Sequence, residues 1–294
     1  MTTGERRPPC PDGVGSGFGE FLRGLLAGIP WSERAEVDET VRLAAPRSGL
    51  LRIDNSNGRT RVIGEDRSDI EVRLQKVARA ESEAAARRTA EAIRLATAET
   101  ESGLDIEIEA PRRWNRRGSV NLELRVPRGT RVEVQASNGK VSVEALRASV
   151  RARSSNGAVE ILDVEGEVEV QSSNARVCCT GCRGRLLARS SNGKIEVAEH
   201  RGAVDAATSN GLIHAALVEL RGPVVLATSN GRIALELPQV VDADVDVRVD
   251  NGIIRNQRPL DHCTHSSGGR LAGTLGRGGV PIKLRTSNGS ISLR

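Results

Sequence analysis

Aromatic residues are almost absent from this 294-residue chain, which has two Phe, two Trp and no Tyr. Globular cores usually draw much of their buried area from aromatic side chains. A core built almost wholly from Val, Ile, Leu and Ala implies a thin interior, which argues against a thick sandwich or a doubly wound sheet. Apolar residues still make up 38% of the chain and charged residues 28%, so the composition is that of a folded protein.

The sequence also lacks the segments that carry a chain into or across a membrane. It has no run of 18 or more apolar residues, and such a run is needed for a transmembrane helix of ordinary length. Residues 1–19 lack the apolar centre of a signal peptide, and Cys10 therefore does not belong to a lipoprotein signal. We expect the protein to stay where it is made, in the cytoplasm.

Neither charge nor cysteine content identifies a partner. The net charge of +5 permits contact with anionic surfaces without requiring it. Disulfide frameworks are typical of short secreted chains with an even number of cysteines. This chain has an odd number, with three clustered, so we expect mostly reduced thiols. They are Cys10, Cys178, Cys179, Cys182 and Cys263.

One triplet is abundant, and internal repeats of this kind indicate stacked architectures. Ser-Asn-Gly, once changed to Ser-Asn-Ala, recurs with its asparagines 18 residues apart. Asn230 and Asn251 follow at intervals of 20 and 21, and Asn288 comes 37 residues later. An isolated Ser56-Asn57-Gly58 lies upstream. The regularly spaced members are Asn138, Asn156, Asn174, Asn192 and Asn210.

Apolar residues recur in step with the triplet, in two short alternating runs per unit. Such alternation is typical of half-buried strands. Between the runs lie two turns, one at the Asn-Gly pair and one at a recurring glycine, because these residues tolerate positive φ. The first run contains Val141, Val159, Val177, Ile195 and Ile213, then Val143, Ile161, Cys179, Val197 and Ala215. The second contains Val150, Val168, Leu186, Val204 and Val224, then Ala152, Val170, Ala188, Ala206 and Leu226.

Two architectures fit this pattern. In a β-solenoid each unit is one coil, and equivalent residues stack about 4.8 Å apart; in an antiparallel meander each Asn-Gly is a hairpin turn. We favour the all-β, single-stranded β-solenoid (β-helix) with coils of about 18 residues, because constant spacing places Asn over Asn and Val over Val. Such ladders stabilise stacked strands. The deciding observation is whether Asn138 to Asn210 form one column.

The segments outside the repeat predict two helices and one irregular stretch. Residues 1–36 read as a flexible tail with a short amphipathic helix over 17–28, which caps the solenoid or docks elsewhere. Weak membrane-surface contact through 17–31 is one such role. Residues 37–294 form the solenoid domain. Within it we expect a helix over 77–99 that caps or crosses the first coils and an irregular loop over 256–280. The edge of the last strand should either be covered by another segment or be an interaction surface.

The repeated Ser-Asn-Gly-x-Val/Ile-x-Val unit resembles a known family when taken together with two further segments. These are Leu51-Arg52-Ile53-Asp54-Asn55-Ser56-Asn57-Gly58 upstream and Thr286-Ser287-Asn288-Gly289-Ser290-Ile291 near the end. The resemblance is to the bacterial putative-adhesin domain of unknown function, over about residues 38–294. It implies a single-stranded β-helix. It carries over no catalytic motif, and fold analogy does not establish a function.

Two cysteine-containing segments have residue types that bind metals. Cys178-Cys179-Thr180-Gly181-Cys182 contains one CxxC, whereas structural zinc sites usually take four ligands from two such pairs. Cys179 falls on an inward position and should pack as a small apolar side chain, while Cys178 points outward. Asp261-His262-Cys263-Thr264-His265 has no standard ligand spacing. Core packing and an idle loop are the simpler interpretations, and we expect no metal and no cofactor.

Two outward carboxylates have a spacing that would permit chemistry on polysaccharides. Glycoside hydrolysis needs two carboxyl groups about 5–10 Å apart. Glu160 and Glu196 share an outward position two coils apart, about 9.6 Å in a regular stack, with Cys178 between them. Because acidic and basic residues mix on every outward column, a solvated face is the simpler interpretation, and we assign no catalytic residue.

The densest basic run is Arg112-Arg113-Trp114-Asn115-Arg116-Arg117. It could hold phosphate, anionic lipid or an acidic glycan, or it could be a solvated hairpin tip. A single Trp gives little support for stacking on bases, so nucleic acid is not an expected partner.

The sequence thus predicts a non-enzymatic scaffold or interaction protein that binds an unknown protein or a cell-envelope partner on its outward columns. Two alternatives stay open: a polysaccharide-acting β-helix enzyme, and a binder of anionic surfaces through Arg112, Arg113, Trp114, Arg116 and Arg117. The ladder of Asn138, Asn156, Asn174, Asn192, Asn210 and Asn230 is assigned a structural role at the turns.

Overall fold

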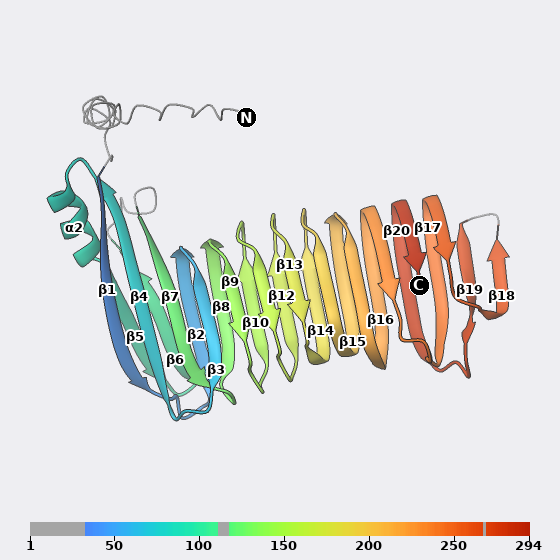
Figure 1. Ribbon diagram of the computed structural model, residues 1–294, viewed down its shortest axis with the longest axis horizontal. Coiled ribbons are helices and arrows are strands. Elements are labelled where there is room, and N and C mark those ends of the chain that lie inside the picture. The colour runs from blue at the N-terminus through green and yellow to red at the C-terminus, as the bar shows by residue number, and fades with distance from the viewer. Residues whose placement is uncertain (1–32, 111–117, 267–268) are drawn as a thin grey trace, which may run out of the picture.

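The computed structural model describes residues 33–110, 118–266 and 269–294, which form one long, flattened rod of stacked strands (Figure 1). The predicted all-β solenoid is confirmed. Among the described residues, no helix is long and apolar enough to cross a membrane.

Parallel coils form the centre of the rod, each with one strand on either broad side. Face A denotes the side made by the half-coil before each Asn-Gly corner, and face B the side made by the half-coil after it. Equivalent residues pair across coils, so that Val150 lies between Val132 and Val168. Face A contains β8 (Arg131–Asn138), β10 (Val150–Ser154), β12 (Val168–Ser172) and β14 (Arg183–Ser190), and face B contains β9 (Val141–Glu144), β11 (Val159–Leu162) and β13 (Val177–Thr180).

Glycine occupies the corner opposite the asparagines because the coils approach closely there. Gly184 and Gly202 have φ values of 121° and 145°. A Cβ atom at either position would lie 2.4 or 2.0 Å from the carbonyl oxygen of the preceding coil. No other residue fits this backbone without displacing it.

Further along the chain the strands are longer, because the backbone passes a corner without leaving the pairing. These strands are β15 (Ile195–Asn210), β16 (Ile213–Glu236), β17 (Ala243–Asn256) and β20 (Val280–Leu293). β20 lies between β16 and β17: Ile282 pairs with Val224 on one side and with Val245 on the other. The edge of the last strand is therefore covered by another segment, because the chain returns and places β20 between β16 and β17.

At the other end of the parallel stack, neighbouring coils are likewise far apart in sequence. β2 (Leu50–Asn57) and β3 (Thr60–Glu65) stack directly on β8 and β9. The strands that extend the rod beyond this coil are β1 (Glu33–Ala44), β4 (Asp69–Ala80), β5 (Arg94–Thr100), β6 (Gly103–Glu109) and β7 (Gly118–Pro127). β6 and β7 continue faces A and B in parallel, after which β5 pairs with β6, β4 with β7 and β1 with β4, all antiparallel.

The helix expected over 77–99 is much shorter. α2 spans Glu83–Glu91 with Ser82 as its N-cap, while residues 77–80 belong to β4 and residues 94–99 to β5. Sheet pairing overrides the helical propensity of these flanks, since Val77 pairs with Glu36 and Ser119, and Leu95 with Ile108. The helix packs Ala86 against Ala35 of β1 and Ala80 of β4.

The segment 256–280 is also more regular than expected. It contains β18 (Asp261–Ser266) and β19 (Arg270–Leu275). β19 adds antiparallel to β17 on face A, and β18 adds antiparallel to β19. The glycines that suggested a loop serve the turns at either end of β19, where Gly269 and Gly276 have positive φ.

The predicted tail and its amphipathic helix over 17–28 lie outside the described residues. β1 already begins at Glu33, so the expected boundary between residues 36 and 37 falls inside a strand.

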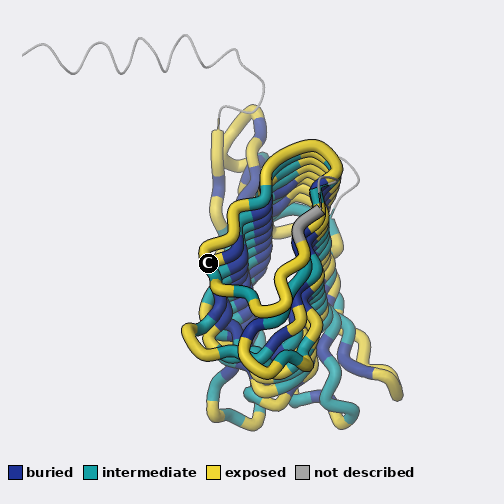
Figure 2. The backbone as a smooth tube through the Cα atoms, turned by 90° about the vertical axis from the view of Figure 1, so that its right-hand side faces the viewer, coloured by how far each residue is buried: buried dark blue, intermediate teal, exposed yellow. Residues whose placement is uncertain are grey.

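The core is a narrow aliphatic strip between the two faces, as the lack of aromatics indicated. Val150, Val168, Leu186, Val204 and Val224 are all at most 1% exposed. Figure 2 shows buried positions, in dark blue, along both walls of a narrow oval section. A fully buried aliphatic side chain of this size contributes about 1.5–3 kcal/mol before entropy is counted.

Candidate functional site

The asparagines of the repeat form one continuous hydrogen-bonded column at the corner between the faces. Each side-chain amide Nδ2 donates to the Oδ1 of the neighbouring asparagine over 2.9–3.1 Å. The predicted column of Asn138 to Asn230 is confirmed, and Asn288 and Asn251 extend it. The spatial order is Asn138, Asn156, Asn174, Asn192, Asn210, Asn230, Asn288, Asn251. These amides bond chiefly to one another, so the ladder is a structural element.

A second, buried column of hydroxyl groups lies just inside this corner and was missed by the sequence reasoning. Ser154 Oγ accepts from the backbone N–H of Gly157 at 3.0 Å, and Ser172 Oγ from Ala175 at 3.2 Å. In later coils Thr208 donates to the carbonyl of Gly193 at 3.2 Å instead. The available signal was the Ser or Thr that directly precedes the triplet. It recurs as Ser154, Ser172, Ser190, Thr208, Thr228 and Thr286.

Alternating charges form a ladder across five strands of face A. Arg52 lies between Asp105 and Glu133, at 3.0 and 3.4 Å. Arg151 lies between Glu133 and Glu169, at 3.4 and 2.8 Å. Desolvation raises the pKa of Glu169, but hydrogen bonds from Arg151 and Arg153 outweigh it and lower that pKa overall. The ladder, which we call the face A ladder, borders a groove of about 360 Å³.

Two carboxylates in this groove have no cationic partner among the described residues. Asp54 of β2 and Glu107 of β6 are register partners on adjacent strands, beside Gln135. Desolvation by burial, and then the charge of Glu107, raise the pKa of Asp54. The groove therefore combines neutralised side chains with one pair of adjacent, uncompensated acidic groups.

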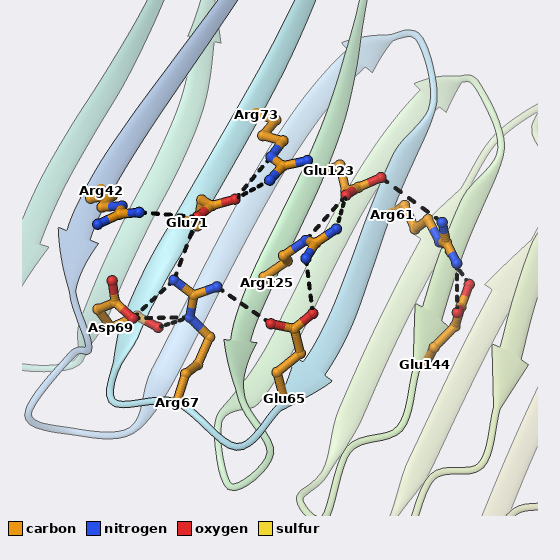
Figure 3. Close-up of polar contacts among 10 residues, drawn as sticks. All are labelled: Arg42, Arg61, Glu65, Arg67, Asp69, Glu71, Arg73, Glu123, Arg125 and Glu144. Atoms are coloured by element: carbon orange, nitrogen blue, oxygen red, sulfur yellow. Dashed lines mark hydrogen bonds and ion pairs between the residues drawn. The ribbon is translucent and has the colours of Figure 1, made fainter.

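Face B carries a denser ion-pair network at the same end of the rod (Figure 3). Arg67 contacts Asp69 at 2.9 Å, Arg125 contacts Glu65 at 3.3 Å, and Arg61 contacts Glu144 at 2.9 Å. The members are Arg42, Arg61, Arg67, Arg73 and Arg125 with Glu65, Asp69, Glu71, Glu123 and Glu144. Equal numbers of both signs tie β1, β4, β7, β3 and β9 together, which suits a stable surface better than a reactive one.

Glu160 and Glu196 do share one column with Cys178 between them. Both carboxylates are paired, however: Glu160 with Lys140, and Glu196 with Arg176 and Lys194. The hydrogen bond from Lys194 lowers the pKa of Glu196 despite partial desolvation. A glycosidase acid must hold a proton near neutral pH, and this environment favours the ionised form.

The cysteines behave as their positions predict. Cys179 is fully buried and packs in the core, while Cys178 is half-buried on face B. Cys182 is also buried, and desolvation raises the pKa of its thiol to about 11. Asp261 to His265 lie in β18, with Cys263 exposed. Across the described ranges, no three His, Cys, Asp or Glu side chains come together as a metal site would require.

Arg112, Arg113, Trp114, Arg116 and Arg117 lie outside the described residues, between the end of β6 and the start of β7. Their role in binding anions stays a prediction.

Residues 50–294 match the family model described as Toastrack DUF4097. The chain belongs to this family. The match confirms the resemblance to a bacterial putative-adhesin domain of unknown function. The Toastrack segment runs from β2 through β20, and among the described strands only β1 lies outside it.

Several solved structures are similar over most of this Toastrack chain. A putative adhesin from Bacteroides fragilis NCTC 9343 is 12% identical, with 90% of this chain and 99% of that one covered and a TM-score of 0.39. A putative adhesin from Parabacteroides distasonis ATCC 8503 is 6% identical, with 88% and 97% covered and a TM-score of 0.35. A putative cell adhesion protein from Clostridium sporogenes ATCC 15579 is 8% identical, with 89% and 99% covered and a TM-score of 0.28. Comparison with curated proteins finds none that matches.

Proposed function

We propose that this Toastrack protein is a non-catalytic interaction scaffold, with the face A groove as its contact surface. The observation that carries the proposal is the face A ladder of Asp105, Arg52, Glu133, Arg151 and Glu169. Side chains that hold one another across strands are already ordered before a partner arrives. Binding to such a surface therefore loses less side-chain entropy than binding to free charged side chains.

The unpaired carboxylates supply the specific element of this surface. Asp54 and Glu107 lie side by side in the groove, and no described cation neutralises them. A basic group on a partner would relieve the repulsion between them and lower the raised pKa of Asp54. The partner in this proposal is a macromolecule that presents a Lys or Arg side chain to face A.

Catalysis is the weaker explanation of the outward residues. The candidate carboxylates Glu160 and Glu196 are each paired with basic residues. The hydrogen bond from Lys194 lowers the pKa of Glu196, so this carboxyl group is not suited to donate a proton. The double variant Glu160→Gln, Glu196→Gln should leave any biological activity of the protein unchanged. A complete loss of activity in this variant, with the fold intact, would instead support the enzyme alternative.

Site-specific photo-crosslinking in the cells that make the protein tests the proposed surface. A photoreactive residue at Gln135, which is exposed in the groove, should give a discrete adduct. The adduct should disappear when Asp54→Asn and Glu107→Gln are combined. A photoreactive residue at Val240, which is 91% exposed and lies between β16 and β17, is the matched control. Equal labelling from both positions, or an adduct that survives the double substitution, would contradict the proposal.

A further inference from the structure

The two ends of the rod are protected to different degrees. At the end formed by the N-terminal strands, the outermost strand of face B is β1, which carries Glu33, Arg34, Glu36, Asp38, Glu39 and Arg42. Helix α2 packs against the same strand. Charged side chains and a covering helix are the usual means by which proteins prevent an edge strand from pairing with another chain.

The opposite end has less protection. On face B the last strand is the Gly252–Asn256 part of β17, which pairs only with β20 among the described strands. Ile253 is 58% exposed there. Ile254 points inward but is only half-buried, although its partner Ile291 on β20 is fully buried. The core is therefore incompletely covered at this position, and Figure 2 shows that the end nearest the viewer is largely exposed.

The backbone of this segment is also free to pair. The N–H of Gln257 donates to the carbonyl of Leu293 on β20, at 2.9 Å. Because successive residues of a strand direct their backbone groups to opposite sides, Ile254 and Asn256 direct theirs away from β20. Among the described residues, the edge thus presents unpaired donors and acceptors next to an exposed apolar side chain.

The end of the rod is a step. Face A extends past β17 by two strands, β19 and β18, whereas face B stops at β17 (Figure 1). At a strand spacing of about 4.8 Å, the step is about 10 Å deep. Its protruding edge is β18, in which residues 261–264 are exposed.

This step is complementary to a second copy of itself. A two-fold axis parallel to the strands places the protruding face A of one copy over the recessed face B of the other. β18 is antiparallel to β19, which is antiparallel to the face A part of β17. β18 therefore runs opposite to the face B strands, so it would meet the partner's edge as an antiparallel strand. An interface of this kind occurs twice about the axis and closes the assembly.

Charge supports the same pairing. Arg255 on the recessed edge and Asp261 on the protruding edge are both exposed, and neither takes part in an ion pair among the described residues. The two segments that would meet therefore carry one unpaired charge of each sign. A β-bulge at His262, where φ is 50°, limits regular pairing of β18 to its second half, Thr264–Ser266.

We propose that the stepped end joins two copies of this chain, with β18 of each copy pairing with Gly252–Asn256 of the other. The pairing covers Ile253 and Ile254 and satisfies the free backbone groups of the edge. It leaves both N-terminal ends outermost, so the dimer is a rod of about twice the length with two face A grooves.

Sedimentation velocity of the full chain, from low to several hundred micromolar, tests this interface. The wild type should shift with concentration from an elongated monomer to a more elongated dimer. Ile253→Arg should abolish the shift. Ile254→Pro should do the same, because it removes an N–H that would bond to the partner's β18. This N–H is not bonded to β20, so the substitution breaks no hydrogen bond between these two strands. Val218→Arg is the matched control, because Val218 is another exposed apolar residue, 45% exposed, on β16 away from the step. It should dimerise as the wild type does.

A charge exchange separates pairing at the step from general surface effects. Arg255→Glu should weaken the dimer at least tenfold, and adding Asp261→Lys to it should restore most of the affinity. Circular dichroism and thermal melting establish that each variant is folded. A wild type that stays monomeric at every concentration overturns the proposal. So does a dimer that is insensitive to Ile253→Arg and Ile254→Pro, because its interface must lie elsewhere.

Discussion

At the scale of single residues, one buried hydroxyl per coil decides how the Asn-Gly corner is held. Ser154 accepts a hydrogen bond from the N–H of Gly157, whereas Ser190, at the same place two coils later, has no hydrogen-bond partner among the described residues. The same residue type at the same repeat position thus has two energetic roles. A buried donor that loses its acceptor costs about 1–3 kcal/mol.

Ser154→Ala should therefore lower the free energy of unfolding by about 1–3 kcal/mol, because the N–H of Gly157 is left unsatisfied. Ser190→Ala is its control and should have little effect or stabilise the protein slightly. Denaturant unfolding of the two variants and the wild type measures the difference. Equal losses in both variants would show that the hydroxyl's bond to Gly157 is not what stabilises the corner.

His200 is the one residue in its column at the other corner that can take up a positive charge. Leu146, Val164, Cys182 and Leu217 occupy the equivalent places in neighbouring coils, and His200 is 1% exposed. Its Nε2 lies 3.2 Å from the carbonyl oxygen of Ala203, while Nδ1 has no hydrogen-bond partner within the part of the chain that the structure describes. Desolvation by burial lowers the pKa of His200 below its ordinary value of 6.5.

This burial predicts a loss of stability in acid. Below pH 6.5 the unfolded chain takes up a proton that the folded protein resists, so the free energy of unfolding falls as the pH drops from 6.5 through the lowered pKa. His200→Leu should flatten this part of the profile. Melting temperatures of both proteins between about pH 7.5 and about pH 5, a range that brackets the ordinary pKa of His, give the comparison. Parallel profiles would mean that His200 is not the responsible group.

At the scale of elements, two ladders of side chains connect neighbouring strands: the asparagine column and the face A ladder. The asparagine column runs the length of the regular stack, and each internal amide both donates and accepts. The face A ladder does the same with charges but ends at Leu187, the residue that pairs with Glu169 on the next strand. The ladders therefore differ in extent because an amide can pair with its own copy, whereas a charge needs its opposite.

Asn174→Asp tests this property of the amide. Asn174 donates to Asn156 and accepts from Asn192, at 2.9 and 3.1 Å. A carboxylate can still accept from Asn192 but faces the Oδ1 of Asn156 without a proton to share. We expect a loss of about 1–2 kcal/mol at neutral pH, larger than for Asn174→Ala. The two variants should converge in stability below about pH 4, where the carboxyl group is protonated. Unfolding of both at neutral and acidic pH shows whether they do.

At the scale of the whole molecule, the order of coils differs from the order of the chain. β20 separates β16 from β17. β2 and β3 stack on β8 and β9, although residues 66–130 lie between them in the sequence. The last strand thus holds the stepped end to the rest of the rod. Among the described residues, β17, β18 and β19 contact one another and are joined to the rest of the rod chiefly through β20.

Removal of residues 280–294 should detach this end while leaving the central coils folded. β17 would lose its only parallel neighbour among the described strands, and Leu226 and Val247 would become exposed. Hydrogen exchange should show residues 243–275 unprotected and residues 131–210 still protected. Removal of Arg294 alone is the control and should change neither region. Protection of 243–275 in the truncated chain would mean that β17 can stack directly on β16.

The sequence by itself determined the repeating part of this protein. Its strands, its inward positions and the column of Asn138 to Asn230 follow from an 18-residue period, because each residue is held by copies of itself in the adjoining coils. The preceding Ser or Thr was equally readable from the same alignment of repeats. These features are local, or depend on the next coil only.

Only the tertiary structure decided the ends and the site. The helix expected over 77–99 is cut back to Glu83–Glu91 by pairing with β1, β7 and β6, which lie far away in sequence. The insertion of β20 between β16 and β17, and the meeting of Asp54 with Glu107 in the groove, depend on which non-adjacent strands become neighbours. A periodic sequence fixes how one coil sits on the next, but where the repeat is interrupted, long-range strand pairing sets the order.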